Sequence, residues 1–90
     1  MSISSGPWAT QIASDVVRDG LGVELIDGQQ QVVAEIFRCD ADHTVFLSLF
    51  VRQVPLHAIE MLVSRARESL EPFEDGTPLA SGNQDVRIHT

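Results

Sequence analysis

The sequence predicts an α+β domain, in which a three- or four-stranded antiparallel β-meander carries one C-terminal α-helix packed on one face. Two apolar stretches, 21–27 and 31–38, flank Asp27-Gly28, a dipeptide that is a strong hairpin signal. A third stretch, 43–53, is rich in β-branched and aromatic residues and predicts a third strand. After it, apolar residues recur every three or four positions, which predicts a helix.

The predicted helix has clear ends. Pro55 suits the first helical position, and Pro72 ends the helix because it disfavours helical backbone at Glu71. Its apolar stripe consists of Leu56, Ile59, Leu62, Val63, Ala66 and Leu70. We expect this stripe to cover one face of the sheet, since a sheet needs one buried face.

Ninety residues make one small domain. We expect a disordered N-terminus at 1–7, a single α+β domain at 8–72 and a flexible acidic tail at 73–90. The tail is rich in Pro, Gly, Asp and Ser and buries too little apolar surface to offset the entropy of ordering. Within it, Phe73 and Leu79 could dock locally.

The segment 8–18 is compatible with two structures. Its apolar residues fit one face of a helix that Gly20 would cap, whereas Asp19-Gly20 could instead turn a hairpin into the strand at 21–27. Ser14 and Asp15 are weak helix formers, so the strand is favoured.

Side-chain parity assigns the strand residues to two faces. If Leu25 lies opposite Val32, and Ile36 opposite either Val45 or Leu47, every pair on one face is apolar. That face holds Leu21, Val23, Leu25, Val32, Ala34, Ile36, Val45, Leu47, Leu49 and Val51. The second face holds Glu24, Ile26, Val33, Glu35, Phe37, Phe46, Ser48, Phe50 and Arg52.

The second face predicts a protein contact. Three Phe residues are unusual on a face left in water, and aromatic residues are enriched at interface cores. An uncharged third strand at the edge of a meander also needs a cover. We therefore expect a homodimer; a monomer whose N-terminal segment folds across the Phe residues, with Trp8 against them, is the alternative. The candidate interface residues are Phe37, Phe46, Phe50, Ile26 and Val33.

Glu24 and Glu35 are the only candidate acid–base pair. They fall on the same face of neighbouring strands, and two close carboxylates beside aromatic rings can separate their pKa values. The alternative is a pair of solvated carboxylates on a half-exposed face.

The stretch Cys39-Asp40-Ala41-Asp42-His43 is favoured as a hairpin turn. A metal site, even with His57 added, lacks a recognisable zinc spacing, and a Cys39–His43 nucleophile pair needs a register that the hydrophobic pattern disfavours. We therefore expect no catalytic residue, no cofactor and no metal.

The net charge of −7 disfavours binding to nucleic acid or to anionic membranes. The N-terminus lacks the pattern of a signal peptide, no apolar run reaches membrane-spanning length, and the single cysteine excludes an internal disulfide. These features predict a cytoplasmic protein.

The run GLGVELID…QVVAEIFRCDADHT…VPLHAIEMLVSRARESLEPFEDGTPL resembles a family of small bacterial proteins with a β-meander followed by a helix. The resemblance covers about residues 19–79 and implies no activity. The sequence thus predicts a non-catalytic, self-associating protein-interaction module. The alternative is a small enzyme or ligand-binding domain that uses the face with Glu24, Glu35 and the Phe residues.

Overall fold

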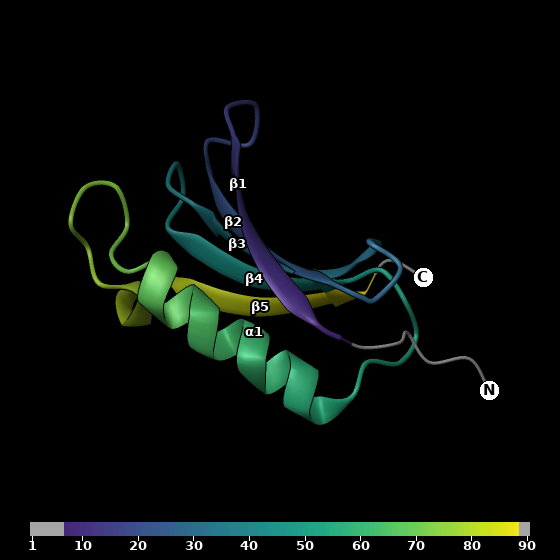
Figure 1. The fold of residues 1–90 in the computed structure, drawn as a ribbon. Helices are drawn as coiled ribbons and strands as arrows, with labels where there is room; N and C mark the ends of the chain where they lie inside the picture. The colour runs from purple at the N-terminus through teal and green to yellow at the C-terminus, as the bar shows by residue number, and fades with distance from the viewer. Residues whose placement is uncertain (1–6, 89–90) are drawn as a thin grey trace.

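The computed structural model describes residues 7–88, and within them a five-stranded, mostly antiparallel sheet is covered on one face by a single helix (Figure 1). The elements are β1 (Ala9–Asp15), β2 (Gly20–Ile26), β3 (Val32–Cys39), β4 (Thr44–Leu49), α1 (Leu56–Ser69), a short 3-10 helix η1 (Leu79–Ser81) and β5 (Asn83–Ile88). The strands lie side by side in the order β1-β2-β3-β4-β5. The predicted α+β class is confirmed, with five strands rather than three or four.

The N-terminal segment forms strand β1, as favoured from its sequence, and pairs antiparallel with β2. It lies at the edge of the sheet, far from the third predicted strand, so it does not cover that strand. Of the predicted disordered N-terminus, only Pro7 lies within the described residues.

Strand β5 lies within the segment that the sequence predicts to be a flexible tail. It pairs with β4 in parallel, so α1 is the crossover connection between the two strands. Two apolar anchors explain the difference, because Phe73 and Leu79 are both buried and bring the chain back to the sheet. Docking of these two residues was expected, but the strand that follows them was not. Because β5 pairs with β4 on its outer side, the third predicted strand does not lie at the edge of the sheet.

The predicted faces are largely preserved, although one register differs. Ile36 lies opposite Leu47, one of the two expected pairings. Leu25, however, lies opposite Ala34 rather than Val32. The shift is two residues, and because side chains alternate with a period of two, it leaves the residues of β3 from Ala34 onward on their predicted faces.

The turn between β2 and β3 explains this shift. The Asp27 carboxylate accepts hydrogen bonds from the backbone N–H groups of Gln29 and Gln31 at 2.9 and 3.0 Å, which makes the loop longer than a two-residue turn. Gln30, rather than Gly28, has the positive φ of 65°. A bulge beside Ile26 then leaves Val33 without a direct partner in the ladder.

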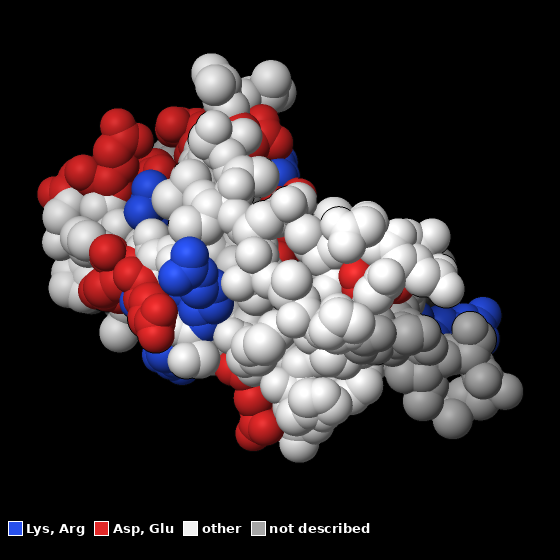
Figure 2. Space-filling model, in the orientation of Figure 1, with Lys and Arg blue, Asp and Glu red and all other residues white. Residues whose placement is uncertain are grey.

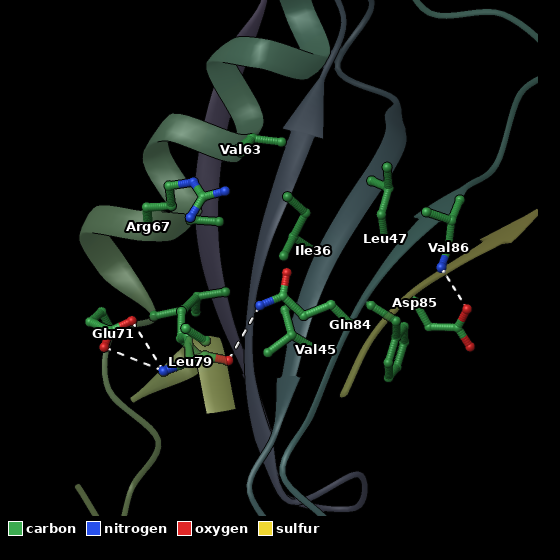
Figure 3. Close-up of a pocket in the computed structure, with 14 residues that line it drawn as sticks. Ile36, Val45, Leu47, Val63, Arg67, Glu71, Leu79, Gln84, Asp85 and Val86 are labelled. Carbon is green, nitrogen blue, oxygen red and sulfur yellow. Dashed lines mark hydrogen bonds between the residues drawn. The ribbon is translucent and has the colours of Figure 1, made fainter. Parts of the chain in front are cut away.

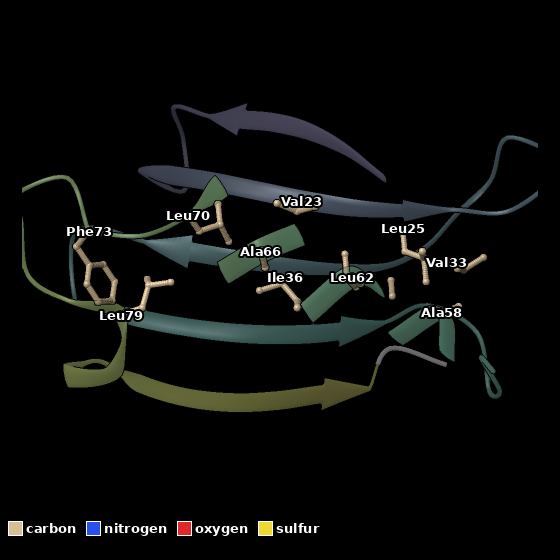
Figure 4. Packing of buried hydrophobic residues seen from close by; sticks show 11 residues of the cluster. Val23, Leu25, Val33, Ile36, Ala58, Leu62, Ala66, Leu70, Phe73 and Leu79 are labelled. Atoms are coloured by element: carbon tan, nitrogen blue, oxygen red, sulfur yellow. The ribbon is translucent and has the colours of Figure 1, made fainter. Parts of the chain in front are cut away.

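The core lies between α1 and the sheet (Figure 4). Leu62 and Ala66 of the helix pack among Val23, Leu25 and Ile36 of the strands. The helix contacts β2 and β3, and its small residues let it approach them closely. The predicted stripe is wrong at Leu56, which is 72% exposed, while Ala58 one turn earlier than Leu62 is buried instead. No helix in residues 7–88 is long and apolar enough to cross a membrane.

Candidate functional site

The five residues predicted to form an interface lie in three different environments. Phe37 and Ile26 are buried on the face away from α1, and Phe46 beside them is half-buried. Val33 does not belong to that face, because the bulge leads it into the core that α1 covers. Phe50 is 41% exposed. Most of the predicted interface is therefore occupied within a single chain.

Two arginines cover the aromatic rings of this face. Phe37 and Phe46 are direct cross-strand neighbours, with ring centroids 5.7 Å apart. The Arg18 guanidinium lies 3.9 Å from the centroid of Phe37, and that of Arg87 lies 4.2 Å from the centroid of Phe46. The expected cover, Trp8, instead packs against the core beneath α1.

Arg18 also forms a two-pronged ion pair with Glu35. Its Nη1 and Nη2 atoms donate to the two carboxylate oxygens of Glu35 at 3.0 Å each. The site depends on glycine, because a Cβ at Gly22 would lie 2.7 Å from the Glu35 carboxylate and one at Gly20 would lie 2.6 Å from the Phe37 ring. We call Arg18, Glu35 and Phe37 the Arg18 clamp.

The electrostatics of the clamp favour charged side chains. The hydrogen bonds with Glu35 raise the pKa of Arg18 further above its usual value, against the effect of burial. Arg18 Nε also donates to Asp15 at 2.5 Å, and this side-chain bond, with the backbone N–H of Arg18, lowers the pKa of Asp15.

Glu24 and Glu35, the candidate acid–base pair, lie directly opposite each other on β2 and β3. Gln11 donates to the Glu24 carboxylate at 2.6 Å, while both oxygens of Glu35 accept from Arg18. These partners offset the repulsion between two opposed carboxylates. Because both Glu35 oxygens are already engaged, the geometry favours a structural role for this residue over proton transfer.

The clamp fixes the turn between β1 and β2, which we call the hairpin tip (residues 16–19). Asp19 has a φ of 55°, and its N–H donates to the Val16 carbonyl at 3.3 Å. The Asp19 carbonyl accepts from the N–H of Asp40 at 2.9 Å. Although the backbone is held in this way, Val16 and Val17 are 92% and 96% exposed.

The Cys39–His43 stretch forms the predicted turn, and it fastens the chain that follows α1. Asp40 accepts from the N–H of Glu74 at 2.8 Å, and His43 Nε2 lies 2.9 Å from Asp75 Oδ2. The His43 ring also packs on Phe73 at 4.7 Å. Cys39 pairs with Thr44 across the strands, so the thiol and the imidazole are not direct neighbours in the ladder.

The carboxylates near this turn are held in their charged form. The Thr44 hydroxyl, and then the Cys39 thiol, lower the pKa of Asp42. The backbone N–H and the hydroxyl of Thr77 lower the pKa of Asp75, with a smaller effect from His43. Within residues 7–88 no three Cys, His, Asp or Glu side chains gather as metal ligands would.

A groove lies on the opposite face, between α1 and the last two strands, with a volume of about 570 Å³ (Figure 3). Its floor and walls are mainly apolar side chains: Ile36, Val45, Leu47, Val63 and Val86. The groove exists because α1 packs mainly over β2 and β3, so that β4 and β5 form its other side, and Leu79 and Ala80 of η1 also line it. We call it the α1–β5 groove.

Polar side chains at the rim of the groove come from α1 (Arg67), from the loop that follows it (Glu71) and from β5 (Gln84 and Asp85) (Figure 3). The Glu71 carboxylate accepts from the N–H of Leu79 at 3.3 Å, and the Gln84 amide donates to the Leu79 carbonyl at 3.3 Å. Arg67 reaches over the groove from α1 and makes no hydrogen bond or ion pair with any residue in the described range. The rim thus offers one uncommitted cation.

The sequence interpretation missed both the clamp and the groove. Gly20 and Gly22 within one strand were a signal for the clamp, since glycine inside a strand often marks the close approach of another group. Val86 and Ile88 alternate with the polar residues Asp85 and Arg87, which was a weak signal for β5, and without β5 there is no groove.

Comparison with known proteins finds no matching family model, no matching curated protein and no matching solved structure.

Proposed function

We propose that this protein is a non-catalytic, self-associating interaction module and that its contact surface is the α1–β5 groove. One observation carries the proposal: α1 packs mainly over β2 and β3, and beside it apolar side chains of β4 and β5 line an open groove. The face with Phe37 and Phe46, where an interface was expected, is already filled by Arg18 and Arg87.

The dimensions support this proposal. Strands are spaced by about 4.8 Å and a helix is about 10 Å wide, so one helix covers about two strands of a sheet. In this protein α1 covers β2 and β3, while Val86 on β5 remains 61% exposed. Leu56 and Ile59 precede Val63 at helical spacing and extend the apolar side of α1 beyond the groove. Exposed apolar surface of this kind marks contact sites.

Two further features of the molecule support such a role. The carboxylates of Glu24 and Glu35, the candidate acid–base pair, are bonded to Gln11 and Arg18, which supports a role without catalysis. A homodimer and a cytoplasmic location are part of this proposal, and the free thiol of Cys39, the sole cysteine, is compatible with that location.

The test is the mass of the protein in solution, measured by light scattering or sedimentation over a range of concentrations. We expect a dimer that Val86→Asp dissociates, because a carboxylate in the groove would be buried at the contact. Ile12→Asp is the matched control, since Ile12 is an exposed apolar residue on β1 at the opposite edge of the sheet. A wild-type protein that stays monomeric at high micromolar concentration would contradict the proposal.

A further inference from the structure

The hairpin tip is the most exposed apolar feature among the described residues. Val16 and Val17 are adjacent, β-branched and almost fully exposed. Figure 2 shows an uncharged projection where Figure 1 places the β1–β2 turn, with acidic residues next to it. Single exposed apolar residues need no explanation, but two together at the end of a hairpin indicate a contact.

The backbone of this tip is anchored to the strands behind it. Arg18, which directly follows the two valines, turns back into the clamp and bonds both oxygens of Glu35. The Arg18 carbonyl also accepts from the Cys39 thiol at 3.4 Å. A backbone that is already held in one conformation loses less conformational entropy on binding, so the clamp prepares the turn that carries the valines for a partner.

We propose that the hairpin tip of one copy of this chain docks in the α1–β5 groove of a second copy. This inference rests on the proposed function and identifies the missing half of that contact. The groove is apolar along Val45, Leu47 and Val86, as a site for two valine side chains requires. A two-fold axis lets each copy donate its tip and receive its partner's.

One pair of opposite charges favours docking, while the two carboxylates that also line the groove, Glu71 and Asp85, accept hydrogen bonds from the backbone N–H groups of Leu79 and Val86. Asp19 of the tip is exposed, and its carboxylate makes no hydrogen bond or ion pair with another described residue. Arg67 at the rim of the groove is likewise uncommitted within the described range. Docking would bring the Asp19 carboxylate to the Arg67 guanidinium, which favours this orientation of the tip.

The contact must form between two chains. The tip joins β1 and β2 at one edge of the sheet, whereas the groove lies over β4 and β5 at the other edge. A tip could reach its own groove only if the sheet came apart.

The outer face of α1 in a second copy is a poorer occupant. It presents charged and polar residues such as Glu60, Ser64 and Glu68, and burying them in an apolar groove would cost free energy. The hairpin tip places no charged side chain at its two most exposed positions.

Complementation between two variants tests the proposal. The double substitution Val16→Asp/Val17→Asp removes the tip but keeps the groove, and Val86→Asp removes the groove but keeps the tip. Each variant alone should have a dimer dissociation constant raised at least about tenfold. Val16 and Val17 are so exposed that their replacement leaves folding intact. Since Val86→Asp could weaken β5, Arg67→Gln serves as a second groove variant.

Mixing the variants restores one of the two contacts. With the tip variant labelled for NMR and the groove variant unlabelled, we expect the signals of Val45, Leu47 and Val86 in the labelled chain to shift. The tip variant mixed with unlabelled tip variant should show no shift. If the mixture shows no shift although the wild type is a dimer, the proposal is overturned.

The other outcomes separate this inference from the proposed function. If Val86→Asp dissociates the dimer and the tip variant does not, the groove is the contact surface but the tip is not its occupant. If the wild type is monomeric, both proposals fail. Asp19→Asn and Arg67→Gln, combined in a double-mutant cycle on the dissociation constant, should be non-additive; additive effects would contradict the charge pairing.

Discussion

Arg18 connects several parts of the molecule through one side chain. It pairs with Glu35, stacks on Phe37 and bonds Asp15, and it lies in the turn that presents the two exposed valines. Nothing about an arginine in a turn predicts these contacts, because they depend on the strand at 32–39 lying beside the hairpin. The sequence placed Glu35 and Phe37 on the correct face but did not identify what covers them.

The two partners of the clamp should differ in their contribution to stability. The Glu35 side chain is 6% exposed and that of Arg18 is 44% exposed. Arg18→Met therefore leaves a buried carboxylate without a partner, and we expect a loss of about 2 kcal/mol in the free energy of unfolding. Glu35→Gln leaves an arginine that water can reach, so the loss should be about 1 kcal/mol.

Urea unfolding of both variants and of the double variant checks this difference. The double variant should lose less than the sum of the two single variants, since neither charge is then left unpaired. Equal losses for Arg18→Met and Glu35→Gln, adding up in the double variant, would show that the clamp is not a coupled pair.

The carboxyl groups of Asp15 and Asp75 should make the stability of the fold depend on pH. Hydrogen bonds lower the pKa of both carboxyls in the folded protein, so they bind protons more weakly than in the unfolded chain. Their contribution is fully present above the unfolded pKa of about 3.9 and is lost as the pH falls through the lower folded pKa. The urea concentration at the unfolding midpoint should therefore decrease as the pH falls below about 4. Asp15→Asn should reduce this fall, and an unchanged profile in that variant would contradict the assignment.

Among the secondary-structure elements, those with a local signal were predicted and those that depend on distant contacts were not. Helix α1 and strands β2, β3 and β4 follow from hydrophobic spacing and turn residues. Strand β5 is short and polar, and it forms because Phe73 and Leu79 bring it against β4. The groove could not be predicted either, since it needs β5 as one of its walls.

Phe73→Ala tests whether that anchor holds β5 in place. Phe73 is fully buried against the core, so its truncation should cost about 3–5 kcal/mol of unfolding free energy. Amide exchange should rise first in β5 (Asn83–Ile88), because its backbone depends on this docking. Glu74→Ala, an exposed neighbour, should change stability by no more than about 0.5 kcal/mol. Uniform exchange in β2 and β5 of Phe73→Ala would show that β5 is held independently.

In the molecule as a whole, the apolar α1–β5 groove and the exposed valines of the hairpin tip lie at opposite edges of the sheet. Leaving either apolar surface in water costs free energy, and docking of the tip in the groove would bury both. Association removes both costs only in the folded state, so by mass action it stabilises that state in proportion to the logarithm of concentration.

The melting temperature should therefore rise with protein concentration. A tenfold increase in concentration contributes about 1.4 kcal/mol per dimer, or about 0.7 kcal/mol per chain. In a domain of this size that corresponds to a rise in Tm of about 3–5 °C per tenfold increase in concentration. The Tm of the variant Val16→Asp/Val17→Asp should depend less on concentration than that of the wild type, whereas the control Ile12→Asp should behave like the wild type. Calorimetry over a hundredfold range of concentration measures this, and a constant Tm for the wild type would contradict self-association.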